Sequence, residues 1–431
     1  MKRITVLGIP LIAVVAMTAS LTFGRGDEKT PNQASTPAGE HDEHGRLEGD
    51  AASPDPRAQG VIVVAGEDGM LRFRPDGTSL GRVTEGYANP GLSFDGAWQA
   101  WSDCGSGGVN ATCRLAVTGA GVANTFDTGA AAVRLQAPSA NTALWAHAES
   151  LLAALDVEKT LYVIEAASRT PTVIATGVSA FAWTADDSLL FAADTPEGPG
   201  LQRYTRGRIT TLAALDTPVT RFYQAPDGMT VAFAQEHTDG WRLLSVDAAT
   251  GALTDYGHIG AVPERNAVHT SAPQFAISWS QDQKYLAVSA VGSPFLLQVF
   301  EIGGNQVVRH FFDEGYAGEL VWSPDNRQLA ISTYSPDRSR HEVYVLDASA
   351  SGGDVRHLLK GCRVVWSPDG LFLALKREPH TEGAGIVEVA TGVHWQLAGS
   401  RVLTPVAWGA DDASAVRRAL EPMPGSSVLG K

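Results

Sequence analysis

The chain has 431 residues, of which 44% are hydrophobic and 19% are charged, so it has ample apolar surface to bury and is not globally disordered. Its formal net charge is −14, and no cluster of Lys and Arg is present to replace phosphate counterions, which argues against a nucleic-acid partner. The length exceeds that of a usual single domain, unless the fold is a barrel or grows by repetition.

The first 24 residues predict a signal peptide or an N-terminal membrane anchor. Lys2 and Arg3 precede an uncharged, mostly apolar run from Ile4 to Gly24, which spans about 21 residues or roughly 31 Å as a helix. The run is long enough to cross a bilayer, and it offers only mediocre cleavage sites. Cleavage and retention both remain open, and either one places the rest of the chain outside the cytoplasm.

Residues 25–59 predict a disordered acidic linker. Leu47 is almost the only large apolar side chain in this stretch, so the stretch cannot bury enough surface to offset its ordering entropy. His41 and His44 lie in the sequence EHDEH. We interpret this sequence as a solvated acidic run, because a disordered metal site would have to be organised by the metal itself.

From Gly60 onward one short pattern recurs. It reads LVWSPDNRQLAI from Leu320 and VVWSPDGLFLAL from Val364, with looser copies elsewhere. The turn residues of the copies are Asp95, Ser139, Asp186, Asp227, Asp282, Asp325, Asp369 and Asp411. Their intervals of 44, 47, 41, 55, 43, 44 and 42 residues match the length of a four-stranded propeller blade.

Each copy has the local chemistry of a strand, a tight turn and a second strand. Pro presets φ at the first corner of the turn, Asp bonds back to the backbone, and Gly tolerates positive φ. Apolar second strands, then alternating third strands and more polar fourth strands, predict four antiparallel strands per unit. The recurring tryptophans before the turn predict packing between blades rather than a ligand surface; they are Trp183, Trp279, Trp322, Trp366 and Trp408.

The two ends of the repeat region complement each other. Gly60 to Gly86 reads as the last three strands of a unit, and Arg401 to Asp412 reads as a first strand. The sequence therefore predicts an all-β propeller at residues 60–412, in which N-terminal strands pair with the C-terminal strand and close eight blades. The number falls to seven if the degenerate copy at Leu135 is not a blade. Residues 413–431 are expected to form a C-terminal tail.

The copies WSPDG, WSPDN, WTADD and WSQDQ, each followed by a short apolar strand, resemble the WD40-like propeller repeat of the TolB type, which also occurs in prolyl oligopeptidase-like peptidases. The resemblance covers about Gly60 to Asp412. It implies a propeller and little about activity, because this fold hosts many unrelated functions. The folded domain that precedes the propeller in TolB-type proteins corresponds here to the predicted linker, so their partner interactions are not carried over.

No catalytic or metal-binding pattern stands out. The Gly-x-Ser-x-Gly pentapeptide of the peptidases with a similar propeller is missing from the sequence. The histidines after the linker lack the spacing of a metal site, so we expect no metal and no cofactor. The alternative is a hydrolase or lyase whose site is assembled from several blades in the axial pocket.

Two further features lead to specific expectations. Cys104 and Cys113 bracket the sequence GSGGVNAT between two predicted strands, so we predict a disulfide across the mouth of this hairpin. The long interval of 55 residues contains an excess of about ten, and the natural place for it is the segment 258–273. The candidate binding residues in this loop are His258, Pro263, Glu264, Arg265, Asn266 and His269.

The most economical interpretation is an extracytoplasmic propeller, anchored by residues 4–24 or secreted after cleavage. We expect it to act as a binding or scaffolding module for a protein or an envelope polymer. The membrane is expected to be contacted only through the N-terminal segment.

Overall fold

The computed structural model describes much of the compact unit Asp50–Lys431 and none of the residues before Ser53. The predicted signal peptide or anchor and most of the predicted linker therefore lie outside the described residues. In the described part, no helix is long and apolar enough to cross a membrane. The described residues are 53–66, 69–83, 91–92, 98–103, 112–119, 126–127, 134–136, 143–146, 151–166, 170–238, 240–260, 275–290, 295–303, 306–312, 316–335, 340–348, 354–378, 383–398 and 403–420.

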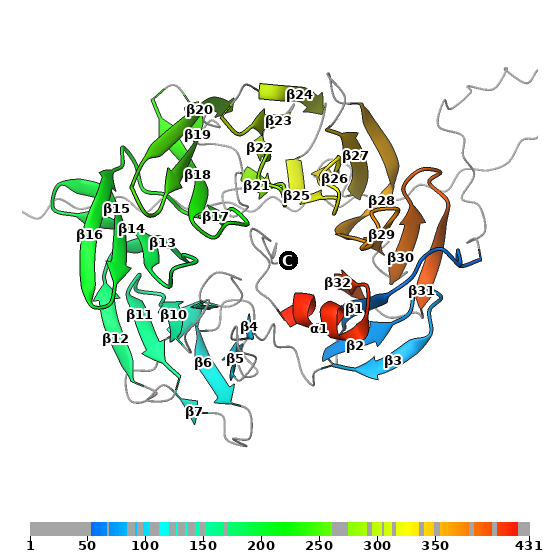
Figure 1. The fold of residues 1–431 in the computed structure, drawn as a ribbon, viewed down its shortest axis with the longest axis horizontal. Coiled ribbons are helices and arrows are strands. Elements are labelled where there is room, and N and C mark those ends of the chain that lie inside the picture. Colours follow the sequence, from blue (N-terminus) through cyan, green and yellow to red (C-terminus); the bar gives the residue numbers. More distant parts are fainter. Residues whose placement is uncertain are drawn as a thin grey trace, which may run out of the picture. The chain divides into compact units, whose positions relative to one another are not determined.

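Antiparallel strands that follow one another in the chain form small sheets, and these sheets succeed one another in a propeller arrangement (Figure 1). The four-stranded sheets contain β1 (Val61–Gly66), β2 (Gly69–Phe73), β3 (Ser79–Arg82) and β32 (Thr404–Gly409); β9 (Ala143–Trp145), β10 (Leu151–Leu155), β11 (Leu161–Glu165) and β12 (Pro171–Ala175); β13 (Val178–Trp183), β14 (Leu189–Thr195), β15 (Gly198–Thr205) and β16 (Arg208–Ala214); β17 (Tyr223–Gln224), β18 (Thr230–His237), β19 (Gly240–Asp247) and β20 (Leu253–Gly260); and β21 (Phe275–Trp279), β22 (Tyr285–Ala290), β23 (Phe295–Glu301) and β24 (Gln306–Phe312).

Two larger sheets complete the described strands. The five-stranded sheet contains β4 (Gly91–Leu92), β5 (Trp98–Asp103), β6 (Thr112–Gly119), β7 (Phe126–Asp127) and β8 (Arg134–Gln136). The seven-stranded sheet contains β25 (Tyr316–Trp322), β26 (Gln328–Ser335), β27 (Arg340–Asp347), β28 (Val355–Trp366), β29 (Phe372–Arg377), β30 (Ala384–Glu388) and β31 (His394–Ala398).

Strand β28 serves two sets of partners. Residues 355–360 pair with β27, whereas residues 361–366 pair with β29. The seven strands therefore divide into two four-stranded units that share one continuous strand. Each unit on its own matches the four-strand repeat predicted from the sequence.

The degenerate copy at Leu135 folds differently from the prediction. Its turn residue Ser139 was expected to join the first two strands of one unit. Instead, the preceding strand β8 pairs with β6, and the following strand β9 begins the next sheet. The repeat pattern therefore locates a unit here, but the first strand of that unit is β9, which follows Ser139, and not β8, which precedes it.

The apolar core is divided into layers between neighbouring sheets. In one layer, Val163 of β11 packs with Phe181 and Phe191 of the following sheet. In another layer, Val343 of β27 packs with Leu373 and Val387 of the following unit. A four-stranded sheet cannot bury both of its faces alone, so every layer depends on two consecutive sheets.

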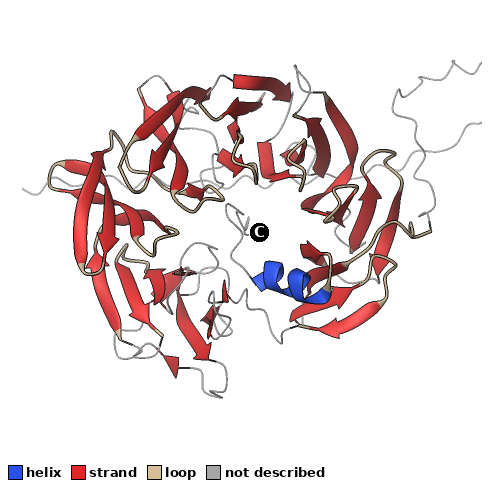
Figure 2. Ribbon diagram, viewed as in Figure 1, coloured by secondary structure: helices blue, strands red, loops and turns tan. Residues whose placement is uncertain are grey.

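The sheet of β1–β3 and β32 is covered differently on its two faces. Ile62 and Val64 pack in a cluster with residues of β29–β31, as the other layers would predict. On the opposite face, Val61 and Val63 pack against Ala415 and Ala419 of helix α1 (Asp412–Leu420). Figure 2 shows this helix lying against the inner side of the sheet.

Helix α1 lies where the sequence predicts only a tail. Asp411, which the repeat assigns to a blade turn, is its N-cap: the Ser414 N–H donates to Asp411 Oδ1 at 2.7 Å. Arg418 then donates to the Trp408 carbonyl at 2.9 Å, which ties the helix back to β32. The last copy of the repeat therefore continues from its first strand, β32, into a helix.

Recurring tryptophans connect the first strands of consecutive units. The Nε1–H of Trp279 donates to the Tyr223 carbonyl at 2.9 Å, that of Trp322 to Ser278 at 3.1 Å, and that of Trp366 to Val321 at 2.8 Å. All three indoles are buried. Each hydrogen bond therefore crosses from one unit to the preceding one and fixes their spacing.

We expect Trp322→Phe to lower the free energy of unfolding by about 1–2 kcal/mol more than Trp241→Phe does. Both changes shrink an aromatic ring, but only Trp322 loses a hydrogen bond and leaves the Ser278 carbonyl without its donor. Trp241 is half-buried, and its Nε1 has no hydrogen-bond partner in the described structure. Urea unfolding of the two variants measures the difference, and equal losses would contradict the inter-unit role.

Candidate binding site at the seam of the first and last sheets

The turn aspartates accept hydrogen bonds from residues of their own turns. In three copies a Ser hydroxyl donates to the Asp two residues later: Ser280 to Asp282, Ser323 to Asp325 and Ser367 to Asp369, at 2.8, 2.6 and 2.5 Å. The same Ser oxygen accepts an N–H five residues on, at 2.9 Å in every copy. These carboxylates therefore close the turns through their Oδ1 atoms.

Two other copies reach the same result with different groups. Thr184 replaces the serine and donates to Asp186 Oδ1 at 2.6 Å. Asp227 accepts the N–H groups of Met229 and Thr230, both at 2.8 Å. Neighbouring turns also touch, because the Ala185 N–H donates to the Gly228 carbonyl at 2.9 Å.

Several other predicted site residues lie outside the described residues. These are Asp95, Cys104, Pro263, Glu264, Arg265, Asn266 and His269, and of Cys113 only the backbone, in β6, is described. The disulfide and the binding loop therefore stay predictions. His258 lies on β20, where its side chain is exposed and its carbonyl accepts a long hydrogen bond of 3.4 Å from Gln298.

A cluster of charges lies where β25, β27, β28 and β29 meet. Arg363 pairs with Glu319 at 2.8 Å, and the backbone N–H of His341 donates to Glu378 at 2.8 Å. Burial and the charge of Glu319 raise the pKa of the neighbouring Cys362 thiol to about 11. A thiol with this pKa is not a nucleophile at neutral pH, so we interpret the cluster as an ion-pair network between two units.

Local sequence patterns do not reveal this cluster, because its partners are 44 and 37 residues apart and belong to different repeat copies. A signal was nevertheless present. Glu319 and Arg363 occupy the same position of two consecutive copies, three residues before the tryptophan. Opposite charges at equivalent positions of neighbouring units indicate a contact.

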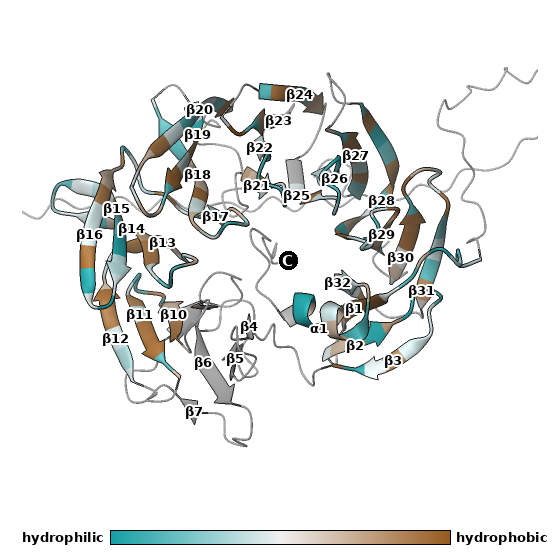
Figure 3. Ribbon diagram, viewed as in Figure 1, coloured by the Kyte–Doolittle hydropathy of each residue, from teal (hydrophilic) through white to brown (hydrophobic). Residues whose placement is uncertain are grey.

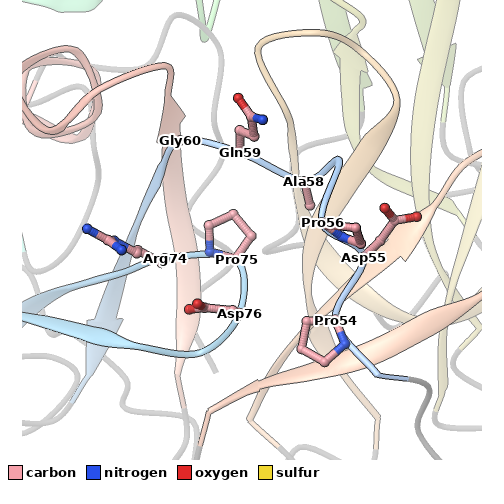
Figure 4. Close-up of a pocket in the computed structure, with 9 residues that line it drawn as sticks. All are labelled: Pro54, Asp55, Pro56, Ala58, Gln59, Gly60, Arg74, Pro75 and Asp76. Carbon is pink, nitrogen blue, oxygen red and sulfur yellow. The ribbon is translucent and has the colours of Figure 1, made fainter.

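One cavity of about 450 Å³ lies among the described residues at the seam between β1–β3 and β29–β31. We call it the seam pocket, and it is lined by Pro54, Asp55, Pro56, Ala58, Gln59, Gly60, Arg74, Pro75 and Asp76. Figure 4 shows residues 54–60 on one side and the β2–β3 turn, with Pro75 and Asp76, on the other. The first of these walls was predicted to be the end of a disordered linker.

Buried indoles hold both walls of the seam pocket. Trp408 donates to the Gln59 carbonyl at 2.8 Å, and Trp395 donates to the Pro75 carbonyl at 3.0 Å. Arg57 adds a further anchor, because it pairs with Glu388 at 2.6 Å and lies over the Phe372 ring. The pocket is therefore preformed, which lowers the entropic cost of binding a ligand.

The chemistry of the lining is mixed. Three proline rings and the Ala58 methyl group supply apolar surface, whereas Asp55 and Asp76 supply carboxylates. The side-chain hydrogen bond from Arg57 lowers the pKa of Asp55, and the backbone N–H of Thr78 lowers the pKa of Asp76. Both groups are therefore charged at neutral pH, and neither can act as a general acid there.

The described residues contain no group of three or more His, Cys, Asp or Glu side chains arranged to hold a metal ion. The seam pocket itself contains two carboxylates, and each already has a protein donor.

Comparisons with known proteins support the fold. No family model matches the chain, and no curated protein matches it. The solved structure of dihydro-heme d1 dehydrogenase NirN in complex with DHE is similar at 14% identity, over 87% of this chain and 78% of that one, with a TM-score of 0.54. A eukaryotic initiation factor is similar at 15% identity, over 81% and 85%, with a TM-score of 0.50.

TolB from Acinetobacter baumannii also matches, at 15% identity over 59% of this chain and 63% of that one. Its TM-score is 0.33, which is too low to support assignment of this chain to the TolB type. At these identities the similarities establish the propeller arrangement alone, since one fold hosts many functions.

We expect Asp325→Asn to reduce the loss of stability on acidification. Burial raises the pKa of Asp325, but the Ser323 hydroxyl and the Arg327 N–H outweigh it, so the pKa lies below its ordinary value. The stability from this group is thus complete above about pH 5 and is lost as the pH falls through the folded-state pKa. Because Asp325 is partly exposed, the effect should be at most about 1 kcal/mol.

Urea unfolding between about pH 3 and pH 7 tests this expectation. The control is Asp354→Asn. Asp354 is exposed, and its one hydrogen bond among the described residues is made by its backbone carbonyl and not by its carboxylate. A steeper acid dependence in Asp325→Asn than in wild type would contradict the role of the carboxylate.

We also expect Gly60→Ala to destabilise the protein by roughly 1–3 kcal/mol more than Gly257→Ala. Both glycines have positive φ, at 98° and 94°, so both variants pay the cost of a left-handed alanine. Only at Gly60 would the new Cβ collide with the Gly409 carbonyl oxygen, whereas nothing lies within 4 Å at Gly257. Thermal unfolding measures the difference, and equal destabilisation would argue against a tight seam.

Proposed function

We propose that this protein is a binding module whose ligand site is the seam pocket. The observation that carries the proposal is the fixing of both pocket walls by the buried indoles of Trp395 and Trp408. A propeller arrangement is consistent with a binding or scaffold role. The ligand proposed is a protein segment or an envelope polymer that presents apolar surface to the prolines and a cation or hydrogen-bond donor to Asp76.

Within this proposal the propeller has eight four-stranded blades of the TolB type. The division of the seven-stranded sheet at β28 supports this number, because the described strands then form eight units. The pairing of β1 with β32, in which Ile62 lies opposite Trp408, supports closure of the ring at the seam. The repeated Trp-Ser-Pro-Asp turns support the TolB type.

The proposal also places the propeller outside the cytoplasm, anchored by residues 4–24 or secreted after cleavage. Its support is the sequence of that segment, in which Lys2 and Arg3 precede an apolar run. Partners would then be found in the envelope. The lowered pKa values of Asp55 and Asp76 argue only against a general acid in the seam pocket. The hydrolase or lyase alternative concerns the axial pocket, where its site would be assembled from several blades.

We expect Gln59→Trp to weaken partner capture by placing an indole at the edge of the seam pocket. Gln59 is one of the residues that line the pocket, and its carbonyl, which binds Trp408, is unchanged by the substitution. Figure 4 shows its side chain pointing away from Pro56 and Pro75, so the new ring lies at the edge of the pocket and leaves both walls intact. The control is Gln396→Trp on β31, an exposed position of the same seam that does not line the pocket. The measurement is cross-linked affinity capture by the full chain from its native envelope fraction, identified by mass spectrometry.

A partner bound by wild type and Gln396→Trp, but at least about tenfold less by Gln59→Trp, supports the pocket. If no protein is captured, the same three chains are sedimented with purified envelope polymer. Binding that Gln59→Trp leaves unchanged in both assays would rule out the seam pocket as the ligand site.

A further inference from the structure

Strand β24 combines an open edge with an unusual amount of exposed apolar surface. It ends its sheet in the order β21-β22-β23-β24, and no described strand pairs with its second edge. Phe311 is 53% exposed, and Val307 is 36% exposed. Figure 3 shows hydrophobic and hydrophilic segments within this strand.

The exposure of β24 differs from that of the other outer strands. Among the described residues, β12, β16 and β20 each expose one large apolar side chain, namely Val173, Ile209 and Leu253. On β24 there are two, and Ile302 in the turn that precedes the strand adds a third. An open strand edge with a hydrophobic flank is a template for pairing with another chain.

Val307 is exposed beside the β-bulge in the pairing of β24 with β23. From Val308 to Phe312 the more buried and the exposed residues alternate, so Phe311 points to the same side of the strand as exposed Arg309. The Arg309 guanidinium lies 5.2 Å from the centre of the Phe311 ring. The strand therefore presents an apolar, a cationic and an apolar group in succession.

This pattern discriminates between possible occupants. In a symmetric pairing of two copies of β24 that sets Phe311 opposite Val307, Arg309 would lie opposite its own copy. Like charges directly opposite each other destabilise a strand pair, whereas opposite charges stabilise it. A second copy of this chain is therefore disfavoured, and a carboxylate on the incoming strand would complement Arg309.

We propose that β24 is a docking strand for an extended peptide segment of another protein. The segment adds to the free edge and carries an acidic residue between two apolar residues, in the order apolar-x-acidic-x-apolar. Main-chain hydrogen bonds to β24 hold the segment, and the alternating side chains select it. This site does not depend on the seam pocket, which is lined by residues 54–60 and 74–76.

The test is selection of displayed random peptides of about nine residues on the full chain, with counterselection against Phe311→Ser. Synthetic peptides from the selection are then titrated against four variants by fluorescence anisotropy. Arg309→Glu should weaken binding by about tenfold or more. Arg309→Lys, which keeps the charge, and Ile209→Ser, on the comparable outer strand β16, should retain binding within about threefold.

All three positions are on the surface, and an unchanged thermal unfolding midpoint confirms that each of the four variants is folded. Selected peptides that show the predicted alternation and lose binding in Phe311→Ser and Arg309→Glu support the proposal. Peptides without an acidic residue, or peptides that bind all variants equally, overturn it. Self-association in sedimentation that Phe311→Ser abolishes would also overturn it, because the occupant would then be a second copy.

Discussion

The structure depends on packing between small sheets that cannot bury their own faces. Each unit has apolar residues on both faces of its sheet, and these residues are buried only by the neighbouring units. The stability of a unit therefore comes from the layers that it forms with its neighbours. The indole hydrogen bonds at Trp279, Trp322 and Trp366 fix how closely the first strands of these units approach. The tryptophan position recurs because the same contact must be made between successive units.

At the seam, a unit is built from two segments that are far apart in the sequence, β1–β3 and β32. β1 pairs with β32, and Gly60 allows the entering backbone to pass close to Gly409. The residues before β1 then lie against the last unit, where Arg57 reaches Glu388. The seam pocket lies between these residues and the β2–β3 turn.

Much of the architecture could be predicted from the sequence, because the same strand-turn-strand pattern occurs in several copies. The turn chemistry of Ser323 and Asp325 and the apolar second strands follow from local patterns. The pairing of β1 with β32 follows from the complementary incomplete units at residues 60–86 and 401–412. Helix α1 and the wall formed by residues 54–60 could not be predicted in this way. Ala415 and Ala58 are buried only through contacts with distant strands, and a single sequence does not display such contacts.

The recurrence that reveals the fold also limits where function can lie. A residue that returns in every unit, such as the turn aspartate, is committed to holding its own unit, and its carboxylate is already bonded. Specific recognition therefore requires positions at which one unit differs from the others. The seam pocket has its own set of prolines and carboxylates, from residues 54–60 and 74–76, and β24 has an exposed Phe311 beside Arg309. These departures from the repeat lie on the surface, where a partner can reach them without disturbing the layers that hold the units together.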